Sequence, residues 1–186
     1  SSKNDFVFSK IKFGKKYKIN NKKNLKNIIE KYKKKIFAII VEPYSASTYQ
    51  NNSKEFLQTC RYLCDKYDIK LIFDEIYTGF GKSGDLFYFI KQNVNPDILI
   101  ISKSFGGGKS SISAFISNKK TLMNSYGNLN DALIHSTTYN GFGEECITAI
   151  EAINLMIKKK YYLNGDKIQK IMRPKLEELK NLHKNK

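Results

Sequence analysis

The chain has 186 residues, with 33 lysines and arginines against 17 acidic residues and a net charge of +16. Its hydrophobic content of 41%, including 12 tyrosines and 12 phenylalanines, excludes an intrinsically disordered chain and suffices for one domain with a sizeable core. No apolar run approaches the length of a membrane span, and the polar start Ser1–Asp5 contains no signal-peptide core. We therefore expect a cytoplasmic protein with no membrane partner.

The basic excess is concentrated in residues 1–35 and 158–186, whereas residues 36–157 carry slightly more acids than bases. A nucleic-acid-binding protein could use such flanks for contacts with phosphates. However, only Arg61 and Arg173 are arginines, the residue preferred for bidentate contacts with phosphates and bases. We interpret the flanks as solvated surface rich in Lys and Asn, and we expect no nucleic-acid partner.

Apolar spacing predicts helices alternating with strands. The predicted strands are the short apolar runs at 37–41, 71–73, 98–101 and 112–116. Helical spacing of apolar residues predicts helices at 23–35, 54–67, 85–92, 144–160 and 166–184, with 119–128 as a helix or loop. A helical crossover makes the first two strands parallel, whereas the short connection between the last two allows only an antiparallel hairpin. The predicted fold is therefore α/β, with a three-layer, mixed but mostly parallel sheet flanked by helices.

Three finer expectations concern these helices. Cys60 and Cys64 lie on one helix face with no histidine nearby in the sequence, so we predict buried free thiols and no metal site. Pro174 should kink or divide the last helix. The apolar side of the helix at 144–160 is predicted to comprise Ile147, Ile150, Ile153 and Ile157.

Two of the predicted strands each deliver one charged residue at the C-terminal end. The run 71–73 is followed by Asp74, and the run 98–101 is followed, after Ser102, by Lys103. Ligands of open α/β sheets bind outside the carboxyl ends of the strands, so this pair is placed for chemistry. Lysine forms Schiff bases with carbonyl groups, and an acid can pair with a basic ring nitrogen. Pyridoxal 5′-phosphate requires both partners.

The motifs around these residues resemble those of the class III (ω-amino acid type) aminotransferases, which are pyridoxal-phosphate-dependent enzymes of fold type I. The family's Ile-Phe-Asp-Glu-Val-Gln-Thr-Gly-Phe-Gly-Arg-Thr-Gly signature resembles residues 72–84. Its strand ending in Glu-Pro resembles residues 41–43, and its Pro-Asp-Ile motif followed by a lysine and a glycine loop resembles residues 96–108. Its His-x-x-Thr-Phe-x-Gly-Asn-Pro loop resembles residues 135–143. The four motifs occur in the family's order.

This resemblance implies an aminotransferase that moves an amino group from a small-molecule donor to a keto acid or aldehyde through a Schiff base on Lys103. Asp74 would pair with the pyridinium nitrogen of the cofactor, and Ile76 would pack on the ring. Tyr77 stands where the family has a Gln that touches the ring hydroxyl. Thr138 would bind the cofactor phosphate of the neighbouring subunit, so the resemblance also implies a homodimer.

The chain departs from the family in two ways. Residues 44–47 and 142–143 differ from the family's usual motifs, which points to an unusual substrate. The family's N-terminal phosphate turn and C-terminal small domain are not identifiable, so we interpret the chain as partial and expect it to be inactive alone. Within it, residues 1–35 would form a basic lead with a helix, 36–157 the core of the cofactor-binding large domain, and 158–186 a helical linker toward the small domain.

Two other functions remain open from the sequence. A related pyridoxal-phosphate-dependent aminomutase, which moves an amine within one substrate, would explain the altered residues 44–47. A non-catalytic basic binding module would use the charged flanks instead of the site.

Overall fold

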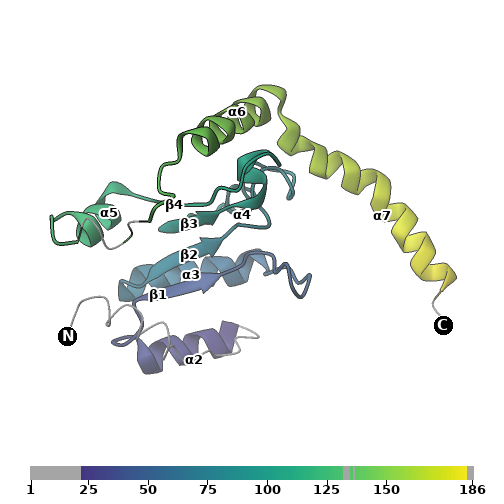
Figure 1. Cartoon of the computed structure of the whole chain (residues 1–186). Helices are drawn as coiled ribbons and strands as arrows, with labels where there is room; N and C mark the ends of the chain where they lie inside the picture. The colour runs from purple at the N-terminus through teal and green to yellow at the C-terminus, as the bar shows by residue number, and fades with distance from the viewer. Residues whose placement is uncertain (1–21, 132–134, 136, 184–186) are drawn as a thin grey trace.

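The computed structural model describes residues 22–131, 135 and 137–183, so the first 21 residues of the expected basic lead lie outside the described residues. The strands are β1 (Ala38–Val41), β2 (Lys70–Asp74), β3 (Ile98–Ile101) and β4 (Ala114–Ser117). The α-helices are α2 (Lys22–Tyr32), α3 (Lys54–Tyr67), α4 (Tyr88–Gln92), α5 (Lys119–Tyr126), α6 (Gly143–Lys159) and α7 (Asn164–Leu182). Two short 3₁₀ turns, η1 (Lys103–Gly106) and η2 (Tyr161–Leu163), complete the elements (Figure 1).

The four strands form one sheet in the order β1-β2-β3-β4. β1 and β2 are parallel, as are β2 and β3, whereas β3 and β4 are antiparallel. The predicted α/β class with a mixed, mostly parallel sheet is therefore confirmed, including the antiparallel β3–β4 hairpin. Parallel β1, β2 and β3 place their carboxyl ends at one edge of the sheet, which is where Asp74 and Lys103 lie.

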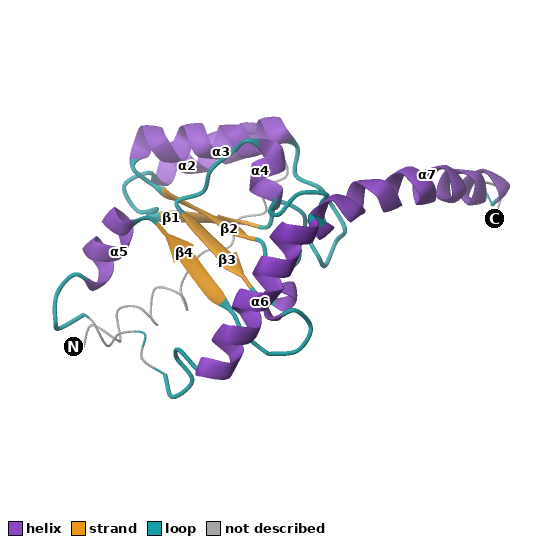
Figure 2. Ribbon diagram, turned by 90° about the horizontal axis from the view of Figure 1, so that it is seen from above, coloured by secondary structure: helices purple, strands orange, loops and turns teal. Residues whose placement is uncertain are grey.

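The core lies between one face of the sheet and α3. Side chains alternate along β2 and β3, so that Leu71 and Phe73 of β2 and Leu99 and Ile101 of β3 are buried. Viewed from above, α2, α3 and α4 lie on that side of the sheet (Figure 2). The opposite face is more open in the described part of the chain, with Ile40 65% exposed.

Helix α3 begins and ends at the predicted residues because local signals stop it at both ends. The Ser53 side chain accepts a hydrogen bond from the amide of Phe56, and Asp68 adopts the left-handed conformation that ends the helix. Its inner face carries the predicted free thiols Cys60 and Cys64, both buried. Burial raises the pKa of each thiol to about 12, so neither is ionised at neutral pH.

Two of the finer helix predictions were wrong in part. In α6, Ile147, Ile150 and Ile157 are exposed, so the prediction was wrong for these three, whereas Ile153 packs partly buried against the core and Ala149 is buried. The helix packs through small residues against η1: a Cβ added to Gly107 would lie 2.9 Å from the Cβ of Ala152, so bulky isoleucines do not fit at this contact. Helix α7 continues through Pro174, so it is not divided there, and a kink at this residue stays a prediction. It projects from the body with no buried residue (Figure 2), so water can satisfy the backbone carbonyl that proline leaves without a partner.

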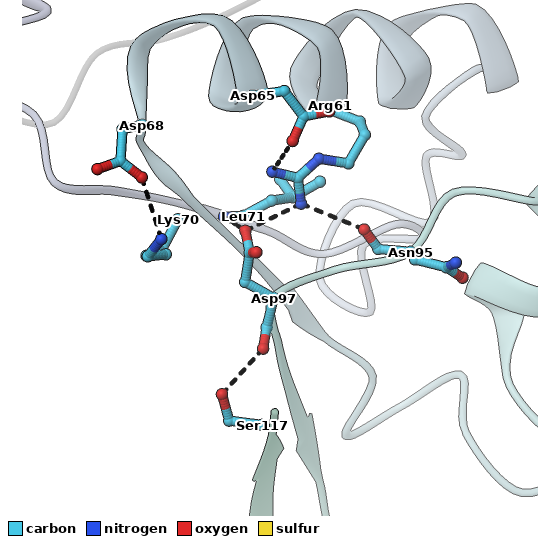
Figure 3. Close-up of polar contacts among 8 residues, drawn as sticks. All are labelled: Arg61, Asp65, Asp68, Lys70, Leu71, Asn95, Asp97 and Ser117. Carbon is cyan, nitrogen blue, oxygen red and sulfur yellow. Dashed lines mark hydrogen bonds and ion pairs between the residues drawn. The ribbon is translucent and has the colours of Figure 1, made fainter. Parts of the chain in front are cut away.

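A polar network fastens the N-terminal ends of β2 and β3 (Figure 3). The Asp97 carboxylate accepts hydrogen bonds from the amide of Leu71 (2.7 Å) and from Arg61 Nη1 (2.9 Å). Ser117 of β4 donates to the backbone carbonyl of Asp97 (3.0 Å), and Arg61 also pairs with Asp65 (2.8 Å). The network joins α3 to three strands at the edge opposite Lys103.

None of the helices within the described ranges is both long and apolar enough to cross a membrane.

Candidate active site

The candidate site lies at the carboxyl ends of β2 and β3. Asp74 is the last residue of β2 and is in register with Ile100 of β3, so the two strand ends are neighbours. Lys103 follows three residues after Ile100, at the start of η1. The structure therefore brings together the two charged residues that the sequence singles out, from segments 29 positions apart in the sequence.

Asp74 is half-buried, and one of its oxygens is already engaged. Its Oδ1 accepts a hydrogen bond from the amide of Ile76 (3.0 Å), which turns the chain sharply at the end of the strand. No other described residue donates a hydrogen bond to this carboxylate. Its second oxygen is thus available to a ligand while the first fixes the orientation of the side chain.

Lys103 has a left-handed backbone conformation, with φ of 50°. This region is uncommon for residues other than glycine, and side chains held there cluster at functional sites. The preceding Ser102 keeps the loop in place by donating a hydrogen bond to the carbonyl of Ile112 (3.2 Å). The Lys103 side chain is exposed.

Tyr77 is the centre of a small cluster that includes two lysines. Lys103 Nζ lies 5.1 Å from the centroid of the Tyr77 ring, and Lys82 Nζ lies 4.7 Å from it. Both distances are within the range of cation–π attraction. Tyr44, from the loop after β1, stacks on Tyr77 with ring centroids 6.0 Å apart. Partial burial lowers the pKa of Lys82, and the positive charge of Lys103 lowers it further.

A cleft of about 680 Å³ adjoins this cluster. Its lining includes Tyr44, Tyr77, Lys82 and Gln92, together with Gln169 from the start of α7. Helix α7 approaches the loop after β2 closely because Gly165 has no side chain: a Cβ on Gly165 would lie 2.9 Å from the carbonyl oxygen of Gly81. The first turn of α7 therefore forms one wall of the cleft.

Glu75 is a functional candidate that the sequence analysis missed. Its side chain is fully buried, and it accepts hydrogen bonds from Thr78 Oγ1 (2.9 Å) and from the amides of Tyr88 (2.7 Å) and Phe89 (2.8 Å). Burial raises the pKa of Glu75, and these three hydrogen bonds oppose that rise. The alternation of β2 could have revealed it, because Leu71, Phe73 and Glu75 follow each other on the buried face of the strand.

The structure does not bring Thr138 to this cluster. Thr138 lies in an exposed turn before α6, where the neighbouring Thr137 hydroxyl is 3.1 Å from Oδ1 of Asn140. Ile76 is half-buried beside Asp74. Within the ranges that the structure describes, no group of His, Cys, Asp and Glu side chains could hold a metal ion.

The chain matches the family model of class-III aminotransferases over residues 4–186. It is 34% identical over 168 residues to an adenosylmethionine-8-amino-7-oxononanoate aminotransferase of Buchnera aphidicola subsp. Baizongia pistaciae, a match that covers 86% of this chain and 38% of the relative. It is 37% identical over 115 residues to an acetylornithine/succinyldiaminopimelate aminotransferase of Buchnera aphidicola subsp. Acyrthosiphon pisum, covering 62% of this chain and 27% of that protein. The chain thus spans well under half the length of these relatives.

Solved structures agree with this assignment. An acetylornithine aminotransferase from Elizabethkingia anophelis superposes with a TM-score of 0.75 at 27% identity, over 88% of this chain and 42% of that one. An S-selective transaminase from Bacillus megaterium superposes with a TM-score of 0.80 at 22% identity, over 88% of this chain and 34% of that one, which shows the shared fold. Because the family model matches nearly the whole length of the chain, the chain belongs to the class-III aminotransferase family.

Proposed function

We propose that the protein is a pyridoxal-phosphate-dependent aminotransferase that transfers an amino group between a small-molecule amino donor and a keto acceptor. The observation that carries this proposal is the meeting of Asp74 and Lys103 at the ends of neighbouring strands. The matched relatives are named as aminotransferases, so neither an aminomutase nor a non-catalytic basic module is favoured.

The described residues fit the cofactor. It requires an amine that can bond to its aldehyde and an acid for its ring nitrogen. Lys103 Nζ supplies the amine, and the available oxygen of Asp74 supplies the acid. When bound, the cofactor acts as an electron sink that lowers the barrier to removing a proton from the substrate carbon.

The roles of this chain's own residues follow from that placement. Lys103 Nζ would hold the cofactor covalently and, once a substrate amine has displaced it, would act as the base that moves a proton. Asp74 would keep the ring nitrogen protonated through its carboxylate. Ile76 would pack on the ring face, and Tyr77 would lie near the ring hydroxyl.

Reductive labelling of the full-length protein tests this assignment. Incubation with pyridoxal phosphate, borohydride reduction and peptide mass mapping should place the label on Lys103, and Lys103→Ala should remove it. Lys109→Ala, which removes an exposed lysine six positions further along the same loop, is the control and should keep the label. A label scattered over surface lysines, or one that survives Lys103→Ala, would overturn the proposal.

We further propose a homodimer in which Thr138 binds the phosphate of the cofactor held by the neighbouring subunit. The exposed position of Thr138, away from the Tyr77 cluster, supports this role. Mixing subunits tests it: the variants Lys103→Ala and Thr138→Ala should each be impaired, and a refolded mixture should regain activity. One site of such a heterodimer combines an intact Lys103 with an intact Thr138. Failure to regain activity would place Thr138 in its own subunit's site or outside any site.

A cytoplasmic location remains a prediction. The free thiols of Cys60 and Cys64 support it, because free cysteines are typical of reducing compartments.

A further inference from the structure

We propose that Glu75 is a positioning residue for the reaction: its buried carboxylate fixes the segment 76–78, and thereby holds Tyr77 against Lys103. The inference rests on the proposed function and assigns a role to the one fully buried carboxylate at this edge of the sheet within the described residues. Glu75 itself would touch neither substrate nor cofactor.

The contacts of Glu75 connect two segments that border the site. Its carboxylate accepts hydrogen bonds from the Thr78 hydroxyl in its own turn and from the backbone amides of Tyr88 and Phe89 at the start of α4. The capping position of α4, Phe87, offers no side-chain cap, so Glu75 supplies that cap from a distant part of the chain. The turn after β2 is therefore tied directly to α4.

The backbone of Glu75 links the same turn to β3, the strand that precedes Lys103. Its amide donates to the carbonyl of Ile100 (2.9 Å), and its carbonyl accepts from the amide of Gly79 (2.9 Å). Tyr77 lies between these two anchored points and has no side-chain hydrogen bond of its own among the described contacts. Its position over Lys103 therefore depends on how firmly the turn is held.

This arrangement requires a side chain that can accept hydrogen bonds at both of its terminal atoms. Three donors point at the two oxygens of Glu75, and a carboxylate accepts at both. A glutamine would direct its NH₂ group at one of the donors and leave a buried amide unpaired. Glu75→Gln should therefore shift the turn while keeping nearly the same side-chain volume.

The test measures where full-length protein is labelled, not how fast it turns over. Each variant is incubated with pyridoxal phosphate, reduced with borohydride and mapped for the ratio of label on Lys103 to label on Lys82. The wild type should label Lys103 strongly. Glu75→Gln should lower the ratio at least about tenfold, because misplacing the groups around a reactive atom by a small distance costs that much or more.

Asp97→Asn is the matched control. It weakens a hydrogen-bonded carboxylate of similar structural importance at the opposite edge of the sheet, and it should leave the labelling ratio unchanged. If Glu75→Gln does not fold, Thr78→Val removes one of the three donors without touching Glu75 and should lower the ratio in the same direction.

Three results would count against the inference. An unchanged ratio in both Glu75→Gln and Thr78→Val overturns it while leaving the proposed function intact. An equal fall in Asp97→Asn reduces Glu75 to a general stabilising residue. Wild-type protein without label on Lys103 overturns the proposed function, and this inference with it.

Discussion

The two ends of the sheet use the same kinds of side chain in opposite ways. At the N-terminal ends, Arg61 and Asp97 lie 2.9 Å apart and neutralise each other, and Asp97 also receives the amide of Leu71. At the C-terminal ends, Lys82 and Lys103 share one aromatic ring and repel each other. Satisfied polar groups stabilise a fold, whereas partly satisfied ones are available to a ligand.

The backbone shows the same contrast. The backbone amide of Asp97 donates a regular hydrogen bond to the carbonyl of Leu71 (2.8 Å), beside the contact between the Asp97 carboxylate and the Leu71 amide. Lys103 instead takes a left-handed conformation that costs stability, and it persists because β3 and α6 hold the loop on both sides. We therefore expect substitutions at the N-terminal edge to change stability and substitutions at the C-terminal edge to change function.

The largest expected effect is the loss of function in Lys103→Arg. Arginine keeps a positive charge over Tyr77, but it cannot give up its proton to act as a base. Amino transfer should fall by at least about 100-fold, the usual contribution of acid–base catalysis, while the free energy of unfolding changes by less than about 0.5 kcal/mol. Single-turnover kinetics and urea unfolding of the full-length protein measure the two quantities. Retained transfer would show that Lys103 is not the base.

The converse substitution is Asp97→Ala at the opposite edge. It leaves the amide of Leu71 without its side-chain acceptor and Arg61 without one of the two acids that it pairs with. The free energy of unfolding should therefore fall by about 3 kcal/mol. Asp65→Ala, which removes the more exposed acid, should cost less than about 1 kcal/mol. Chemical unfolding compares the two variants. A similar cost for both would show that this partly buried network is no more important than a surface ion pair.

A smaller effect should appear in the pH dependence of stability. Burial raises the pKa of Glu75 above its ordinary value of 4.5, so protonated Glu75 favours the folded state. The stabilisation of the folded state by protonated Glu75 is fully present below pH 4.5, and it is lost as the pH rises through the folded-state pKa. The free energy of unfolding of wild type relative to Glu75→Gln should therefore fall as the pH rises from that value. A relative stability that increases instead would mean that the three hydrogen bonds outweigh burial.

The smallest effect expected is a gain in stability from Lys103→Gly. Glycine adopts a positive φ without steric cost, although it also makes the unfolded chain more flexible. The folded state should gain about 0.5 kcal/mol from this exchange while the proposed covalent label disappears. Differential scanning calorimetry measures the gain. A loss of stability would show that the Lys103 side chain contributes more to folding than its backbone strain costs.

Local signals in the sequence determined much of this protein. Helix α3 and strand β3 begin and end at the predicted residues, because Ser53 caps the helix and a bounded run of branched apolar residues defines the strand. The short β3–β4 connection dictated their antiparallel pairing. Asp74 and Lys103 were identifiable because Asp74 directly follows one apolar run and Lys103 follows another after Ser102, and because the carboxyl ends of parallel strands meet at one edge.

Only the tertiary structure decided the environment of those residues. Glu75 accepts hydrogen bonds from backbone amides 13 and 14 positions further along the chain, and Arg61 donates a hydrogen bond to Asp97, 36 positions away. Local spacing in the sequence does not encode contacts at such separations. Apolar spacing placed four isoleucines on the inner side of α6, but only Ile153 packs against the core there, beside Ala149 and Ala152, because the glycine loop at Gly107 approaches the helix closely. Local propensity therefore set the elements and their order, whereas burial and close packing between distant segments set which side chains hold the site and which could react in it.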